Sequence, residues 1–174
     1  LDQSEGNLHV GDTAWHGGGN WSVLPWIKIG FYLDELTRDT GAIRVIPGSH
    51  RYGEGYAEAL QAGLREPEGT WGVGGDQVPA VAVETTPGDV VIFHQGTKHS
   101  AWGGGDRRRM FTLNCTRRHT DEELPIMRQE VANFARFQTD SVYGDAMVDT
   151  ATPVRMRHLE QPLANQDHLA ALSE

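Results

Sequence analysis

The chain has 174 residues, of which 38% are hydrophobic and 22% charged, as expected of one ordinary globular domain. A formal net charge of −9 argues against general electrostatic binding to nucleic acid or to an anionic membrane, but it leaves room for a local basic site. A single cysteine, Cys115, excludes an internal disulfide, and no apolar run reaches the roughly 18 residues that a membrane span needs. No signal-peptide pattern is visible, and the chain is predicted to be cytoplasmic.

The first predicted strand ends at His16. The chain begins with Leu1 rather than Met and enters this strand almost at once, so we expect an N-terminal part to be missing. Residues 26–33, WIKIGFYL, alternate with a period of two, which predicts a strand with two different faces. We expect its aliphatic face to pack into a core. The mixed face, which carries Lys28, is expected to line a polar barrel interior.

Further short strands are predicted along the chain, and glycine- and proline-rich turns separate them. They cover residues 42–50, 78–86, 90–94, 98–102 and 107–118. Residues 51–78 are predicted to be a long irregular insertion with a short helix at 56–64, which is typical of a lid or a binding loop.

The composition changes after residue 118. Thr120 and Glu123 form a capping box that predicts a helix to about residue 137, and a weaker helix is expected over 161–172. The whole pattern predicts an all-β core with flanking helices, a sandwich or jelly roll. We expect this core to span 1–118 and a helical extension to pack on it over 119–174.

Two histidines and a run of arginines stand at the ends of predicted strands. His16 ends the first strand, and His99 follows 83 residues later, just after a turn. Two imidazoles that a barrel brings together make half of an iron, zinc or copper site. Arg107, Arg108 and Arg109 open the next strand, where an arginine can hold a carboxylate in a bidentate grip. A lone histidine is more often structural, and alternate arginines of a strand face solvent, so only the joint pattern favours a site.

Several motifs occur in a characteristic order. GDTAWHGGGN, TGAIRVIPGSH, PGDVVIFH and the segment from His99 to the arginines resemble the phytanoyl-CoA dioxygenase-like family of Fe(II)- and 2-oxoglutarate-dependent enzymes, over about residues 8–118. The resemblance implies a double-stranded β-helix (jelly roll, cupin-like), with His16 as the proximal and His99 as the distal iron ligand. It also implies an arginine that binds the distal carboxylate of 2-oxoglutarate. Arg108 aligns best with this arginine, and Arg109 is the alternative if the register shifts by one.

The sequence departs from the family at the third iron ligand. The family's proximal motif is His-x-Asp, whereas this chain has His16-Gly17-Gly18. The two histidines and one carboxylate of the usual site become two histidines and a gap. Iron-dependent halogenases of this fold have Gly or Ala at the same position, where chloride or bromide binds in place of the carboxylate. We therefore interpret His16, Gly18 and His99 as the catalytic centre of a halogenase, with a halide beside Gly18.

Two alternatives remain open. In the first, the protein is a hydroxylase with an atypical iron site that takes a carboxylate from elsewhere. Asp12 is expected over 12 Å away along an extended strand (about 3.3 Å per residue), and Asp34 and Glu35 lie at the far end of the second strand, so none is an obvious substitute. In the second, the metal site is inactive and the jelly roll is a binding module.

The cofactors that the resemblance implies are Fe(II), 2-oxoglutarate, O₂ and chloride or bromide. With them, a halogenase would place a halogen on an unactivated carbon of a small molecule. Lys28 is a candidate contact for 2-oxoglutarate or a substrate anion, and a rim lysine that extends to water is the alternative. The arginine cluster favours a free, polar, phosphorylated substrate such as a nucleotide. His94, five residues before His99, is predicted to be structural rather than a third ligand.

Overall fold

The protein is described by a computed structural model over residues 12–17, 26–105, 108–134 and 141–172. The chain forms two compact units, Leu1–Arg117 and Arg118–Glu174. Among the described residues, no helix combines the length and the apolar character needed to cross a membrane.

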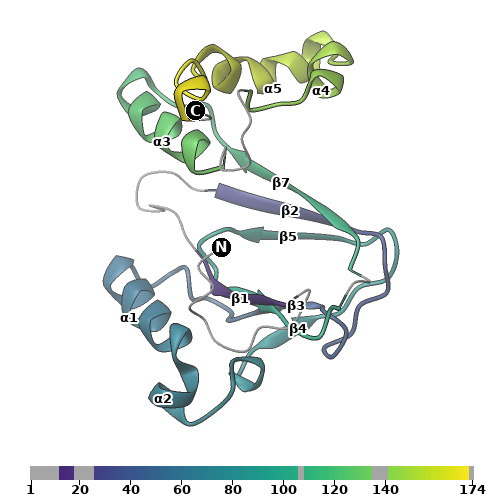
Figure 1. Ribbon diagram of the computed structural model, residues 1–174, viewed down its shortest axis with the longest axis vertical. Helices are drawn as coiled ribbons and strands as arrows, with labels where there is room; N and C mark the ends of the chain where they lie inside the picture. Colours follow the sequence, from purple (N-terminus) through teal and green to yellow (C-terminus); the bar gives the residue numbers. More distant parts are fainter. Residues whose placement is uncertain (1–11, 18–25, 106–107, 135–140, 173–174) are drawn as a thin grey trace. The chain divides into compact units, whose positions relative to one another are not determined.

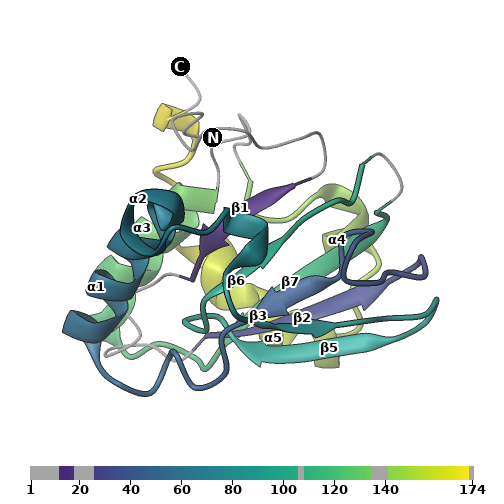
Figure 2. The ribbon, with the colours of Figure 1, turned by 90° about the horizontal axis from the view of Figure 1, so that it is seen from below.

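The first unit contains two antiparallel sheets (Figures 1 and 2). One has the order β1-β6-β3-β4, formed by Thr13–His16, His99–Ala101, Ile43–Val45 and Val81–Val83. The other has the order β5-β2-β7, formed by Val90–His94, Trp26–Tyr32 and Met110–Thr116. Together with the flanking helices, these sheets confirm the predicted jelly-roll class. The strands at 26–33 and 90–94 are predicted almost to the residue because alternation and turn residues define them.

The main core of this unit draws residues from both sheets and from the turn after β2. Its buried residues are Tyr32, Leu36, Ala42 and Ile43, and partly buried Val45, Val83, Val91, Phe93 and Met110 pack against them. Since these side chains come from β2, β3, β4, β5 and the start of β7, the core lies between the two sheets.

The mixed face of β2 points inward, as predicted, but the aliphatic face does not pack into a core. Tyr32, on the mixed face, is only 1% exposed, whereas Ile27 and Leu33, on the aliphatic side, are 45% and 49% exposed. Cross-strand partners extend this outer face, with Ile29 between Ile92 and Leu113. Period-two alternation separates two faces but does not say which is inside. The prediction that the aliphatic face packs into a core is therefore wrong for the described residues.

Strand β1 contains an irregularity beside the histidines. Thr13 pairs with Ala101 and His16 pairs with His99. The two pairs are three residues apart on β1 but only two apart on β6, so β1 has one extra residue between them. One extra residue in a strand is a β-bulge, a feature that recurs beside functional sites. Its result is that Ala14 and Trp15 both line the outer side of this sheet, where a cavity lies.

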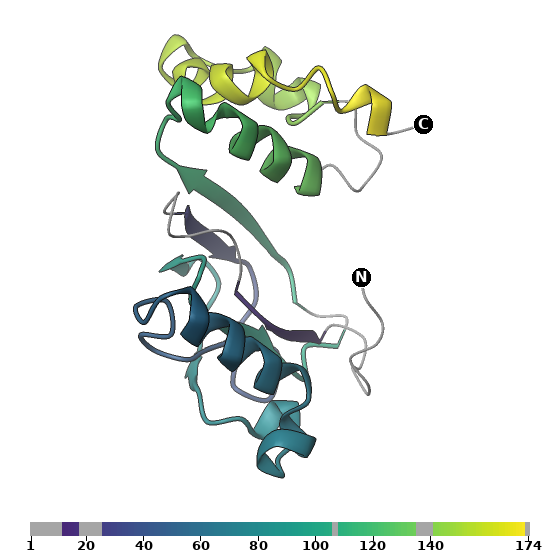
Figure 3. The same cartoon turned by 90° about the vertical axis from the view of Figure 1, so that its left-hand side faces the viewer.

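Helices α1 (Glu54–Arg65) and α2 (Pro67–Trp71) and the short helix η1 (Gly75–Gln77) occupy the segment predicted to be mostly irregular. They lie on the side of the β1 sheet that faces away from the second sheet (Figure 3). Pro67 stands in the first turn of α2, a position that suits its fixed φ and missing N–H. A Cβ at Gly63 would come within 2.6 Å of the Trp71 ring, so the contact between the two helices requires glycine there. Trp15, Leu64 and Val78 form the buried cluster beneath them.

The second unit is helical over its described residues. It contains η2 (Asp121–Glu123), α3 (Leu124–Phe134), α4 (Asp145–Asp149), α5 (Pro153–Ala164) and η3 (Ala170–Leu172). The predicted capping box is confirmed, because the Thr120 N–H donates to the Glu123 carboxylate at 2.9 Å. The helix predicted over 161–172 instead starts at Pro153, capped by the Thr152 hydroxyl, and ends at Ala164.

Candidate metal centre

His16 and His99 meet at the ends of β1 and β6. They are direct cross-strand partners, and their ring centroids are 4.0 Å apart. The Phe93 ring, from the inner face of β5, contacts the His99 ring edge-on at 4.9 Å. The predicted pair is therefore brought together, and it faces the space between the sheets.

Each ring of this histidine pair is oriented by a main-chain oxygen two residues earlier. His16 Nδ1 lies 2.8 Å from the Ala14 carbonyl oxygen, and His99 Nδ1 lies 2.7 Å from that of Thr97. A carbonyl oxygen only accepts, so both Nδ1 atoms carry the proton and both Nε2 atoms keep a lone pair. His99 Nε2 is buried without a hydrogen-bond partner. An Nδ1–H bond to a carbonyl and an unpartnered Nε2 are what a metal-binding histidine shows.

The surroundings keep both histidines neutral. Burial lowers the pKa of His99 to about 3, and the charges of His16, Lys28 and Lys98 add to that effect against the opposing Thr97 hydrogen bond. His16 is open to solvent at one side, yet the protein around its ring is the largest cause of its lowered pKa. A neutral imidazole is the form that binds a metal, so this site would not need to release protons at neutral pH.

Three cations, Lys28, Lys98 and Arg108, lie close enough to act on the pair. All three lower the pKa of His16, and the two lysines also lower that of His99. Lys28 is on the inward face of β2, and burial lowers its pKa. Within the described part of the chain, no hydrogen bond or ion pair of the Lys28 ammonium is found. The region around the histidine pair is therefore strongly positive in a chain whose net charge is −9.

Arg108 and Arg109 have opposite environments. Arg108 is partly buried, is hydrogen-bonded to Tyr32 and lies 3.4 Å from the Thr13 hydroxyl, and its Nε is buried without a partner. The Arg109 side chain is 73% exposed and forms an ion pair with Asp34 at 2.6 Å. The structure thus brings Arg108, but not Arg109, to the histidine pair.

The carboxylates considered as substitute ligands are engaged or exposed elsewhere. Asp12 accepts a hydrogen bond from the Gly103 N–H at 2.6 Å and lines the outer cavity. Asp34 binds Arg109, and Glu35 is exposed. Among the described residues, no group of three or more His, Cys, Asp or Glu side chains is placed to hold a metal. Gly18 and Arg107 lie outside the described residues.

Sequence reasoning missed Lys98. It is 3% exposed and directly precedes His99, and its ammonium donates to the Gly17 carbonyl at 2.7 Å and to Gln61 Oε1 at 3.0 Å. A signal was available, because Lys28 and Lys98 are the only two lysines among the 15 Lys and Arg residues. Burial lowers the pKa of Lys98, and the nearby Arg65 lowers it further.

His94 forms a different pair. Its ring stacks on that of His50, with centroids 4.9 Å apart and planes inclined by 14°. Its Nδ1 accepts a hydrogen bond from the Gly96 N–H, and His50 Nδ1 is 3.0 Å from the Thr97 hydroxyl. Parallel stacked rings do not point their nitrogens at one point, so this geometry agrees with a structural role.

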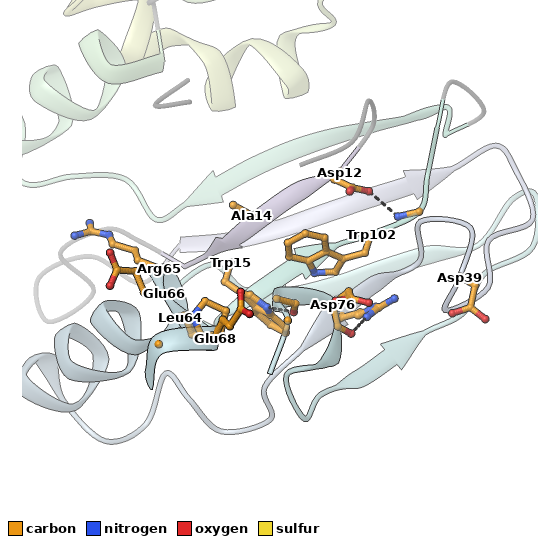
Figure 4. Close-up of a pocket in the computed structure, with 16 residues that line it drawn as sticks. Asp12, Ala14, Trp15, Asp39, Leu64, Arg65, Glu66, Glu68, Asp76 and Trp102 are labelled. Carbon is orange, nitrogen blue, oxygen red and sulfur yellow. Dashed lines mark hydrogen bonds between the residues drawn. The ribbon is translucent and has the colours of Figure 1, made fainter. Parts of the chain in front are cut away.

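A cavity of about 890 Å³ lies on the other side of β1 (Figure 4). Trp15 and Trp102 line it, and Trp15 Nε1 donates to the Gly75 carbonyl at 2.7 Å. Its ionisable lining residues are Asp12, Asp39, Glu66, Glu68, Asp76, Arg44 and Arg65. Carboxylates predominate here, so the cavity differs in charge from the region around the histidine pair.

The family comparison agrees with the geometry of the first unit. The model of the phytanoyl-CoA dioxygenase (PhyH) family matches residues 4–110, more than half of the chain. The chain belongs to the phytanoyl-CoA dioxygenase family. The match includes the histidine pair and ends just after Arg109. No curated protein sequence matches the chain.

Solved structures are similar only in part. EvdMO1 is 18% identical with a TM-score of 0.45, and 62% of this chain aligns to 24% of that one. EctD from S. alaskensis with 2-oxoglutarate and 5-hydroxyectoine is 24% identical with a TM-score of 0.39, over 59% of this chain and 37% of that one. The carbocyclase SnoK from nogalamycin biosynthesis is 22% identical with a TM-score of 0.40, over 67% of this chain and 50% of that one. The chain therefore spans at most half the length of these proteins.

Proposed function

We propose that this phytanoyl-CoA dioxygenase family member is an Fe(II)- and 2-oxoglutarate-dependent halogenase. The observation that carries the proposal is the positive surroundings of the histidine pair, next to a sequence position where the family has aspartate and this chain has Gly18. His16 and His99 fit the metal, since both present a deprotonated Nε2 and that of His99 is buried without a partner.

Charge favours an inorganic anion as the third ligand. Removing a carboxylate removes one negative charge from the site, while Lys28, Lys98 and Arg108 remain nearby. Opposite charges attract most strongly where protein replaces water around them. Chloride or bromide at the place of the missing carboxylate restores the lost charge, and glycine carries no side chain that would compete for that place.

Arg108 is the proposed partner of 2-oxoglutarate. A guanidinium binds a carboxylate through two parallel hydrogen bonds, and the Arg108 guanidinium is held inside the unit by Tyr32 and Thr13. Lys28, on the neighbouring strand β2, presents a second positive charge toward the same space. Arg109 is occupied by Asp34 and is not assigned a role.

Bound Fe(II) supplies the oxidising chemistry, in which O₂ and 2-oxoglutarate give succinate and CO₂. The balanced reaction consumes one substrate C–H group, one halide and one proton, and it gives the carbon–halogen bond and one water. The histidine pair holds the metal, Arg108 orients 2-oxoglutarate, and the cations hold the halide. Whether the substrate carbon receives halogen or hydroxyl then depends on how the protein positions that carbon relative to each of the two groups.

A small, polar, phosphorylated metabolite such as a nucleotide is the proposed substrate class. Lys28 supports an anionic substrate, because its ammonium faces the site and makes no described ion pair. The acidic chain as a whole gives no support to a nucleic acid polymer.

The test is a turnover assay under anaerobic loading of Fe(II) and 2-oxoglutarate, followed by O₂, across a panel of phosphorylated metabolites with and without chloride. We expect succinate formation and a product mass that rises by exchange of hydrogen for chlorine. A product that instead gains one oxygen, with the same yield in chloride-free buffer, would identify a hydroxylase. Protein that binds no iron at all would identify a binding module.

Gly18→Asp provides the matched variant. A restored carboxylate competes with the halide for the same place, so chlorination should fall below detection while iron binding is kept. Gly18→Ala is the control, since a methyl group adds bulk without charge and should retain halide-dependent chemistry. Crystals grown with iron and bromide should show anomalous scattering from bromide at the metal in the wild type and in the Ala variant only.

A further inference from the structure

The main-chain oxygens on either side of His16 are both held by side chains from outside β1. Lys98 Nζ donates to the Gly17 carbonyl at 2.7 Å, and Gln61 Nε2 donates to the Trp15 carbonyl at 2.8 Å. The two side chains also join each other, because Lys98 Nζ donates to Gln61 Oε1 at 3.0 Å. This arrangement, the Lys98–Gln61 clamp, closes around the residue that presents the proximal imidazole.

The clamp is anchored to rigid elements. Gln61 belongs to α1, which packs against β1. The Lys98 N–H donates to the buried Ser49 hydroxyl at 2.8 Å, and the Lys98 carbonyl accepts from the Ile46 N–H at 2.9 Å. Side chains that are fixed at several points hold a ligand more precisely than free ones do.

Gly17 allows the close approach on which the clamp depends. A Cβ at position 17 would lie 2.7 Å from the Thr97 carbonyl oxygen and 3.0 Å from the Lys98 Cα. Only a residue without a side chain lets the backbone after His16 run against the backbone before His99. The same approach brings the Gly17 carbonyl within reach of the Lys98 ammonium.

The Lys98 ammonium is a buried charge without a described counter-ion. It is 3% exposed, its two acceptors are neutral, and among the described residues no carboxylate forms an ion pair with it. Burying an unpaired charge is costly, so a negative ion nearby is strongly favoured.

We propose that Lys98 and Gln61 are positioning residues for the metal centre, and that the Lys98 ammonium provides the charge that retains an inorganic anion beside the metal. This inference rests on the proposed function, since it concerns the same anion. The two residues have different roles. Gln61 only holds the backbone around His16, whereas Lys98 holds that backbone and also supplies a positive charge.

The experiment uses the full chain loaded with Co(II), whose visible spectrum reports coordination without turnover. Affinity for Co(II) is measured first, and azide and bromide are then titrated into the loaded protein. In Lys98→Met, we expect the anion affinity to fall about 10- to 100-fold, because a nearby buried charge is lost. In Gln61→Met, the charge stays, so anion affinity should change less than about threefold while the spectrum and the affinity for Co(II) change.

Arg109→Gln is the matched charge control, because the Arg109 side chain is 73% exposed and pairs with Asp34, outside the clamp. We expect it to bind Co(II) as the wild type does and to lose less anion affinity than Lys98→Met. Equal anion affinity in Lys98→Met and the wild type would overturn the inference and leave the proposed function standing. Wild-type protein that binds no Co(II) would instead remove the proposed function.

A second measurement covers the case in which Lys98→Met does not fold. The two lysines of the chain give two backbone signals after selective ¹⁵N-lysine labelling, assigned with Lys28→Met. In Zn(II)-loaded wild-type protein, bromide should shift the Lys98 signal more than that of Lys28. A Lys98 signal that does not respond while bromide binds would contradict the role assigned to Lys98.

Discussion

Strand β1 separates two regions of opposite charge within the first unit. On its inner side, Lys28 and Arg108 lie near the histidine pair, and the charge of Lys98, whose ammonium bonds to Gln61 of α1, also acts on His16. On its outer side, the 890 Å³ cavity is lined by more carboxylates than arginines. The net charge of −9 belongs to the whole chain and does not reveal the positive region around the histidine pair. An acidic chain can therefore still contain an anion site, because β1 and the buried Trp15 separate the negative cavity from the positive histidine region.

Removing one of the two histidines should have the largest effect on the inner region. We expect His16→Ala and His99→Ala to lower metal affinity more than about 100-fold. Even the loss of a residue that only hydrogen-bonds to a metal ligand lowers metal affinity by roughly 10–100-fold. Competition with a metal indicator dye measures this. His94→Gln is the control, as His94 stacks on His50 instead, and equal losses in all three variants would contradict the assignment.

Arg108 and Arg109 allow a partly buried arginine near the histidine pair to be compared with an exposed one. Arg108→Gln should weaken 2-oxoglutarate binding about 10- to 100-fold, the value of a charge-assisted bidentate contact. Arg109→Gln should leave that affinity unchanged, because the Arg109 side chain is 73% exposed and is paired with Asp34 away from the histidine pair. Titration of 2-oxoglutarate into anaerobic Fe(II) protein distinguishes the two. A loss in Arg109→Gln alone would favour the other register.

Acid should destabilise the metal-free protein through His99. Its pKa falls from 6.5 in the unfolded chain to about 3 in the folded one, so the unfolded state binds more protons between these values. This contribution to stability is complete above pH 6.5 and is lost as the pH falls toward 3. Urea denaturation at several pH values should show a shallower pH dependence over this range in His99→Phe than in the wild type. Identical slopes would mean that His99 does not remain neutral.

The smallest effect is expected on the outer side of β1. Glu66→Gln and Glu68→Gln remove negative charge from the rim of the cavity, where both residues are exposed. Exposed charges are screened by water and salt, so anion affinity at the metal should change less than about twofold. A clear gain in affinity would show that the two regions are coupled.

Sequence patterns predicted strand positions and the histidine pair better than they predicted directions in space. Alternation located β2 and its inward mixed face, but it did not show that Ile27 and Leu33 on the aliphatic face are exposed. The motif order supplied His16 and His99. It did not reveal the Lys98–Gln61 clamp, because the two residues are 37 positions apart and meet only through the placement of α1. The bulge in β1 has no local signature such as glycine within the strand.

The extra residue in β1 also determines which mutations the site tolerates. The imidazole of His16 is oriented by the Ala14 carbonyl, and that of His99 by the Thr97 carbonyl. Every amino acid has a carbonyl, so replacing the side chain at either acceptor leaves the acceptor in place. Deleting a single residue from β1 would remove the bulge and change the course of the main chain before His16, although a carbonyl oxygen would still stand two residues earlier. We therefore expect the orientation of the proximal ligand to tolerate point substitutions at position 14 better than a one-residue deletion from β1.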